Sequence, residues 1–168
     1  MPEPVQERRY TWQDPAAIAA KARQLSGQAF FDQMISTGSR PPIADTFDFD
    51  LIGVEDGVLH WRGRPGPWAM NPIGTVHGGY AATILDSAMG CAVHLSLDQG
   101  EAYTTVDLSV KYLRPLMPDT QISATGRLVH RGRSLAVAEA ELFDHRGKRA
   151  AHATTSCMIF RPDQKSQA

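Results

Sequence analysis

The sequence predicts an α+β fold in which a six-stranded antiparallel sheet wraps around one long, buried helix. From Tyr80 to Leu97 the only acidic or basic side chains are Asp86 and His94. A helix that is apolar on most of its sides is expected to be buried. Beyond Gly100, strand-like stretches of alternating apolar and polar residues are separated by turns. This period of two is typical of antiparallel strands.

Helix caps, turns and periodicity predict the elements in order. Residues 1–13 are expected to form a loose polar leader, and Asp14 with Pro15 supplies an N-cap and a first turn. The prolines after Ser39 predict a rigid, extended connector. The expected elements are helices over about 14–26 and 28–36, the connector over 39–43, strands over about 45–54 and 58–64, the long helix over about 77–97, and strands over about 103–113, 121–130, 135–143 and 149–160.

These elements predict a helical N-terminal extension over 1–40, a sheet-and-helix domain over 41–161 and a polar tail over 162–168. A chain of 168 residues with 42% hydrophobic content suits one hydrophobic core. A sheet of this kind leaves strand edges open, and open edges pair readily with a second copy. We therefore expect a homodimer with a continuous sheet, with a homotetramer as the alternative.

Composition argues against several classes of protein. The net charge of −1 and a pI near 6.6 favour neither nucleic acid nor acidic membranes as partners. Cys91 and Cys157 are isolated, which gives neither a disulfide framework nor zinc spacing, and we expect no metal and no cofactor. The N-terminus lacks the apolar region of a secretory signal, and no apolar run reaches the roughly 18–20 residues of a membrane span. We therefore expect a cytoplasmic protein.

One stretch combines a turn, a helix start and a carboxylate: NPIGTVHGGYAATILD, from Asn71 to Asp86. A carboxylate in an apolar helix is costly unless it is paired, hydrogen-bonded or used in chemistry. At about 100° per residue, small residues lie within roughly 40° of Asp86, namely Gly79, Ala82, Gly90 and Val93. The helix begins about two turns earlier, at Gly78, where free N–H groups suit an anion or a developing oxyanion.

On these residues the chain resembles the hot-dog thioesterase superfamily. It is most similar to the acyl-CoA thioesterases related to phenylacetate-pathway (PaaI-type) enzymes and to one branch of 4-hydroxybenzoyl-CoA thioesterases. The resemblance covers about residues 41–160 and also includes TTVDLSVKYLRP (104–115) and HRGRSLAVAEAELFDHRGKRAAHATTS (130–156). It implies the hot-dog fold, in which the sheet wraps the central helix, and hydrolysis of an acyl-CoA thioester.

The resemblance also implies roles for two residues of the helix. The acidic catalytic residue of the family falls on Asp86. Its carboxylate would attack the thioester carbonyl as a nucleophile or activate a water as a base. The backbone N–H that polarises this carbonyl falls on Gly78. This pair also fits the chemistry itself, because thioester hydrolysis needs a base or nucleophile, a water and an oxyanion site. A structural carboxylate is the alternative for Asp86.

Three further residues are candidates by the same resemblance, each with a structural alternative. Asn71 would position the water or the thioester, but it is also an ordinary turn residue. His77 lies beside the glycine, but it could simply cap the helix. A hydroxyl that orients the water or carboxylate aligns with Thr105, with Thr104 one register away, although threonine is common in strands.

Candidates for contacts with CoA are less specific. Gly79 would let substrate approach the backbone. Arg114, Arg131 and Arg133 flank two turns and could bind phosphates, because arginine matches phosphate geometry. Solvated hairpin charges are an equal alternative for the three arginines.

A thioesterase is the favoured function, and there are two alternatives. A non-catalytic hot-dog module could bind acyl-CoA as a sensor, but it would need a fused partner or DNA-binding domain. A hot-dog hydratase would need an Asp and a His on a different helix-start pattern. The acyl group is not defined by the sequence, although the apolar residues near the helix start suit an aryl or medium-chain tail, namely Trp68, Met70, Ile73 and Tyr80.

Overall fold

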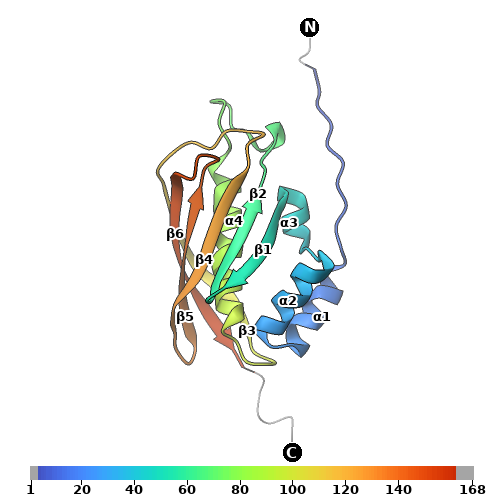
Figure 1. The fold of residues 1–168 in the computed structure, drawn as a ribbon, viewed down its shortest axis with the longest axis vertical. Helices are drawn as coiled ribbons and strands as arrows, with labels where there is room; N and C mark the ends of the chain where they lie inside the picture. Colours follow the sequence, from blue (N-terminus) through green and yellow to red (C-terminus); the bar gives the residue numbers. More distant parts are fainter. Residues whose placement is uncertain (1–3, 162–168) are drawn as a thin grey trace, which may run out of the picture.

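The computed structural model describes residues 4–161, so the predicted tail over 162–168 lies outside the described residues. The elements, shown in Figure 1, are α1 (Pro15–Gln24), α2 (Gly27–Thr37), α3 (Pro42–Phe47), β1 (Phe49–Glu55), β2 (Val58–Gly63), the short 3₁₀ helix η1 (Pro67–Ala69), α4 (Gly78–Leu95), β3 (Ala102–Tyr112), β4 (Ile122–Arg131), β5 (Leu135–Phe143) and β6 (Arg149–Phe160).

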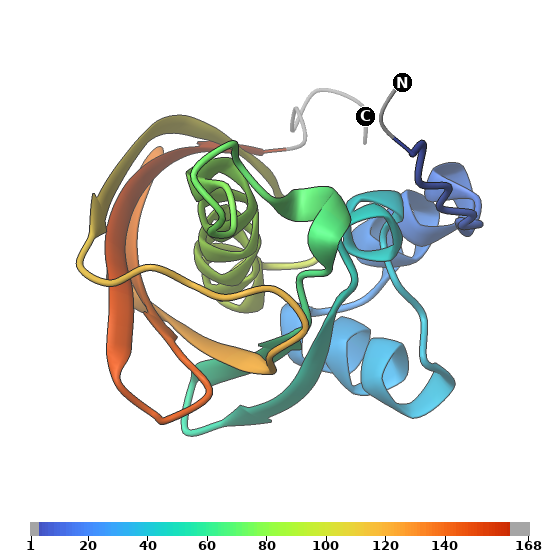
Figure 2. The ribbon, with the colours of Figure 1, turned by 90° about the horizontal axis from the view of Figure 1, so that it is seen from above.

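The strands form one antiparallel sheet in the order β1-β2-β4-β5-β6-β3. Seen from above in Figure 2, the sheet curls around α4, while α1, α2 and α3 lie together on the right of the view. This arrangement confirms the predicted fold class. It leaves β1 and β3 as the two edges of the sheet.

Small residues bring the sheet close to α4. The concave face of the middle strands carries alanines, and Ala138, Ala140 and Ala153 are completely or almost completely buried. At Gly126 on β4, an added Cβ would overlap the backbone carbonyl of Ala88 on α4. Interiors are close-packed, so larger side chains here would force the helix away from the sheet.

The N-terminal helices are docked onto the domain rather than loosely attached. Phe30 and Phe31 of α2 are buried, and both rings contact His94 edge-on near the end of α4. An added Cβ at Gly27 would come within 2.5 Å of the His94 carbonyl oxygen. The first turn of α2 therefore lies directly against the backbone of α4, and this contact requires a glycine.

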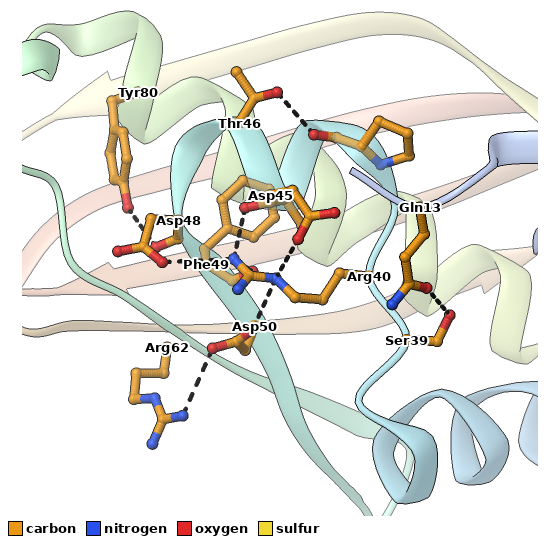
Figure 3. A network of polar contacts seen from close by, with 12 residues as sticks. Gln13, Ser39, Arg40, Asp45, Thr46, Asp48, Phe49, Asp50, Arg62 and Tyr80 are labelled. Atoms are coloured by element: carbon orange, nitrogen blue, oxygen red, sulfur yellow. Dashed lines mark hydrogen bonds and ion pairs between the residues drawn. The ribbon is translucent and has the colours of Figure 1, made fainter. Parts of the chain in front are cut away.

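The segment before α1 also differs from the loose leader that the sequence suggested. It runs alongside α3 as an extended chain (Figure 1), and the Arg8 guanidinium donates a hydrogen bond of 2.6 Å to the Thr46 carbonyl. The Ser39 hydroxyl donates to the Gln13 side chain at 2.9 Å (Figure 3). Its described part, residues 4–14, is therefore attached at two points.

The connector prediction over 39–43 was wrong in part, because α3 begins at Pro42. A proline suits the first turn of a helix, where its missing N–H leaves no bond unmade. The following residues are held by Arg40, whose Nε lies 3.2 Å from Asp45 and 3.0 Å from Asp50 (Figure 3). This network holds α3 against the start of β1. The strand predicted over about 45–54 therefore begins only at Phe49.

Candidate active site

The loop before α4 is closed by Asn71. Its Oδ1 accepts hydrogen bonds from the N–H groups of Ile73 (3.0 Å) and Thr75 (3.4 Å), and its Nδ2 donates to the Thr75 hydroxyl at 3.0 Å. The Asn71 N–H also donates to the Thr75 carbonyl. The side-chain amide is thus engaged within its own loop, which is the turn role that the sequence left open for this residue.

The N-terminus of α4 is capped by His77. Its Nδ1 accepts the Gly79 N–H at 2.8 Å, and its backbone N–H donates to the Ala69 carbonyl at 2.7 Å. The cap therefore engages the N–H of Gly79, the second residue of the helix, and does not engage that of Gly78, the first. Within residues 4–161, no hydrogen bond engages the Gly78 N–H. A free N–H at the positive end of an 18-residue helix suits a carbonyl oxygen that gains negative charge.

Asp86 lies on the half-buried side of α4 and faces β3. The Thr105 hydroxyl donates to Asp86 Oδ1 at 3.1 Å, so the structure brings together these two predicted residues. One carboxylate oxygen is held in place by this bond. Among residues 4–161, no salt bridge to Asp86 is formed.

A β-bulge in β3 decides which side chains face α4. The register with β6 shifts between Thr105 and Asp107, so Val106 is the extra residue. Before the bulge, Thr105 contacts the helix. After it, Tyr112 does so, since its hydroxyl donates to the Gly78 carbonyl at 3.0 Å. The uninterrupted alternation that the sequence predicted for the strand over about 103–113 was therefore wrong, because a bulge adds one residue to one strand.

Tyr112 is the residue near the helix start that sequence reasoning missed. It lies in TTVDLSVKYLRP, near the end of the predicted strand over about 103–113. The signal was available in principle, because a tyrosine at the end of a strand carries both an apolar ring and a hydroxyl that can reach a helix terminus. A Cβ added at Gly78 would lie 3.1–3.3 Å from atoms of this ring.

Two cavities meet at His77. The first, about 340 Å³, lies between the start of α4 and the ends of β3 and β6, and it includes Gly78, Tyr112 and Arg114. The second, about 520 Å³, lies on the other side of the helix start and has Tyr10, Phe47, Trp68 and Tyr80 in its wall. Since His77 lines both, an extended molecule that crossed the helix start would have space on either side.

The three predicted arginines lie in different environments. Arg114 lines the first cavity and donates to the Arg149 carbonyl at 2.7 Å, so it lies near Gly78. Arg131 is paired with Glu101, just beyond the far end of α4, and Arg133 is exposed in the same hairpin. Within one chain, therefore, only Arg114 is brought close to the helix start.

The titratable groups buried on α4 or against it are held neutral. Burial, aided by the charge of Asp86, raises the pKa of the Cys91 thiol to about 12. Burial also raises the pKa of the Tyr103 phenol and lowers the pKa of His94. A thiol with this pKa is not a nucleophile near neutral pH. Asp86 is thus the ionisable group of α4 left to take part in chemistry.

Gly78 and Asp86 are too far apart to act on one carbonyl group within a single chain. They lie eight positions apart in one continuous helix, which corresponds to about 12 Å along the axis at 1.5 Å per residue. A nucleophile or base must come within about 3 Å of the reacting atoms or of a water beside them. The two groups can meet at one carbonyl group only if each comes from a different copy of the chain.

Neither a metal site nor a membrane-spanning helix is present among the described residues. Among residues 4–161, no cluster of His, Cys, Asp and Glu side chains is arranged to hold a metal ion. None of the helices formed by these residues combines the length and hydropathy needed to cross a bilayer.

The central part of the chain is similar to known proteins. Residues 73–151 match the thioesterase superfamily model. Acyl-coenzyme A thioesterase 13 of Mus musculus is 32% identical over 72 residues, which is 43% of this chain and 51% of that protein. The chain spans about half to two thirds of the length of the first curated relatives, 64% and 51% for two of them.

Solved structures agree with this match. A phenylacetic acid degradation-related protein from Ralstonia eutropha JMP134 has a TM-score of 0.69 and 29% identity, covering 76% of this chain and 98% of that one. A hypothetical thioesterase from Streptococcus pneumoniae TIGR4, solved with coenzyme A, has a TM-score of 0.60 and 25% identity over 68% of this chain and 88% of its own. Residues 73–151 are therefore similar to the thioesterase superfamily, and the resemblance to hot-dog thioesterases is confirmed.

Proposed function

We propose that this protein is an acyl-CoA thioesterase that works as a homodimer and converts an acyl-CoA and water into a carboxylic acid and free CoA. The observation that carries the proposal is the division of the chemical groups along α4, with a free N–H at Gly78 and a carboxylate at Asp86. The thioesterase-superfamily match over 73–151 and the CoA-bound structure of the S. pneumoniae protein support the substrate class.

The edges of the sheet support the homodimer. β3 is an edge strand, and it exposes apolar side chains, with Val106 at 57% and Leu108 at 39% exposure. An exposed edge with apolar residues pairs readily with another strand. In a two-fold dimer built on this edge, two α4 helices would lie antiparallel, so the Gly78 end of one would approach Asp86 of the other. A homotetramer remains the alternative assembly.

The reaction then follows from the Gly78 N–H of one copy and the Asp86 carboxylate of the other. The thioester oxygen accepts the Gly78 N–H of one copy, which draws electrons from the carbonyl carbon. Asp86 of the other copy either removes a proton from a water that attacks this carbon or attacks the carbon itself. The carbon–sulfur bond breaks and the CoA thiolate takes up a proton. If an anhydride with Asp86 forms, water hydrolyses it and restores the carboxylate.

The other predicted residues support these two groups in the proposal. Thr105 positions Asp86 by donating to one of its oxygens, and His77 shapes the helix start by accepting the Gly79 N–H. Asn71 holds the preceding loop. Arg114, beside Gly78, is the arginine best placed for CoA phosphate, while Arg131 and Arg133 would require the partner copy. The two free cysteines suit the reducing cytoplasm, which we propose as the location.

The first test replaces the carboxylate. Asp86→Asn keeps the side-chain size, and loss of a base or nucleophile lowers kcat by roughly 100-fold or more. Asp56→Asn is the matched control, because Asp56 lies in the β1–β2 turn with a φ of 50° that asparagine also adopts. The assay measures thiol release across a panel of acyl-CoA substrates. Wild-type rates in Asp86→Asn would remove this residue from the mechanism, and binding of acyl-CoA without hydrolysis by wild type would favour the sensor.

The second test asks whether the site is shared between two copies. Asp86→Asn and Gly78→Val are each expected to be inactive, but a mixed dimer retains one site with both wild-type groups. Random mixing makes half of the dimers mixed, so about a quarter of wild-type activity should return. Activity that does not return on mixing, or an active monomer of 18.4 kDa by light scattering, would contradict the shared site.

A further inference from the structure

The segment before α1 forms part of the wall of the second cavity. Arg8 and Tyr10 line this cavity of about 520 Å³ together with Trp68 of η1 and the helix-start residues Gly79 and Tyr80. The Arg8 guanidinium carbon lies 3.6 Å from the centroid of the Trp68 ring, a close cation–π contact. One end of the cavity is thus at the proposed reaction centre, and a cation from the N-terminal segment stands in its wall.

The charge of Arg8 is not neutralised by the residues that the structure describes. Its one hydrogen bond there is to the neutral Thr46 carbonyl, and no carboxylate of residues 4–161 forms a salt bridge with it. The Asp48 carboxylate, two residues after Thr46, is paired with Arg40 at 3.6 Å. Among the residues that line the cavity, Arg8 carries the one permanent charge. A partly buried cation without a counter-ion favours an anionic ligand group.

We propose that Arg8 selects the acyl group, and that the preferred substrates are CoA monothioesters of dicarboxylic acids. This inference rests on the proposed thioesterase function and adds a substrate class to it. The acyl chain enters the aromatic cavity from the helix start, and its distal carboxylate pairs with the guanidinium. The CoA moiety then occupies the first cavity, on the Arg114 side of His77.

The position of Arg8 in the chain explains why this specificity belongs to this protein. The match to the thioesterase superfamily begins at residue 73, whereas Arg8 is held against the cavity by Thr46 and Trp68, which both precede that match. The reacting groups and the specificity residue therefore lie in different parts of the sequence. The N-terminal segment can define the substrate without altering the groups at Gly78 and Asp86.

The test compares acyl groups of equal length that differ by one terminal carboxylate: succinyl-CoA against butanoyl-CoA, and adipoyl-CoA against hexanoyl-CoA. The proposal predicts that wild type prefers the dicarboxylic member of at least one pair. Arg8→Met keeps a similar stem without the charge, and it should lower this preference in kcat/KM by about tenfold or more, as expected for loss of a charged hydrogen bond. Continued hydrolysis of the neutral member shows that the variant is folded.

Arg9→Met is the matched control, because Arg9 is the next residue and its side chain is 88% exposed in an ion pair with Glu7. This variant should keep the wild-type preference. A preference that is equal in wild type and Arg8→Met, or that falls equally in both arginine variants, overturns the role of Arg8. A wild-type protein that hydrolyses none of these or other acyl-CoA substrates overturns the proposed thioesterase function as well.

Discussion

Gly78→Ala should separate activity from stability at the start of α4. The added Cβ would lie 3.1 Å from Tyr112 Cζ and 3.2 Å from its hydroxyl oxygen. Carbon atoms prefer separations of about 3.5–4.0 Å, so the ring must withdraw by a few tenths of an ångström. Tyr112 can do so because its side chain is at an exposed position, with 56% exposure, and is tied to the helix through one hydrogen bond.

The two contributions to the free energy of unfolding nearly cancel in this variant. Loss of the Tyr112 hydrogen bond costs about 0.5–1.5 kcal/mol. The gain from alanine over glycine is at most about 1 kcal/mol, the value for a helix interior, because Gly78 is the first residue of α4. A remainder below about 1 kcal/mol shifts Tm by about 2–4 °C or less in a chain of this size. The thioester, however, would be displaced from the Gly78 N–H, and a shift near 1 Å can lower kcat/KM by about 100-fold.

The assay for this variant combines thermal melting with kcat/KM on the best acyl-CoA. Gly53→Ala is the matched control, since no atom lies within 4 Å of its added Cβ and its φ is not positive. Full activity in Gly78→Ala would show that the thioester does not lie against this turn. A large loss of both Tm and activity would show that the packing estimate at Tyr112 is wrong.

Three further predictions concern stability. Gly126→Ala should lower the free energy of unfolding by about 1–3 kcal/mol or more, because its Cβ would overlap the Ala88 carbonyl; a wild-type Tm would contradict this. Burial favours a higher pKa for Glu101, but hydrogen bonds from the Asp98 N–H, Arg161 and Arg131 lower it overall. The stabilisation by Glu101 is therefore present above the unfolded pKa of about 4.3 and is lost as pH falls through the folded pKa. Urea unfolding should show that Glu101→Gln is less stable than wild type by about 1–3 kcal/mol at pH 7. If this difference in stability does not become smaller near pH 3, the ionised Glu101 carboxylate is not its source. His94 has a lowered pKa through burial, so stability should fall as pH drops below about 6.5; His94→Phe should reduce this slope, and an unchanged slope would exclude His94 as its source.

The long helix and the strands could be predicted because their signals are local. The apolar character of 80–97 indicates a buried helix whatever surrounds it, and the glycines at 78–79 mark its start. The sheet follows from the periodicity of the strands beyond Gly100. The pairing of Asp86 with Thr105 also agreed with the sequence, although it came from the resemblance rather than from periodicity.

The remaining features depend on contacts between distant residues. The bulge at Val106 changes which side chains of β3 face the helix, and no residue type in TTVDLSVKYLRP marks it. The helix α3 depends on Arg40, whose partners Asp45 and Asp50 lie five and ten residues further along the chain. The contact of Arg8 with Trp68 spans 60 residues. A pattern within one segment does not contain such information.

The strand order has a consequence for how the chain acquires its fold during synthesis. β6, the last strand, lies between β5 and β3, so β3 has no neighbour in the sheet until residues 149–160 have left the ribosome. The pairs in this ladder run up to Ala102 with Phe160, and closing such long loops is slow. In a nascent chain, the side of α4 that faces β3 would therefore stay uncovered until β6 pairs with β3. The hydroxyl of Thr105 would reach Asp86 only after this last pairing.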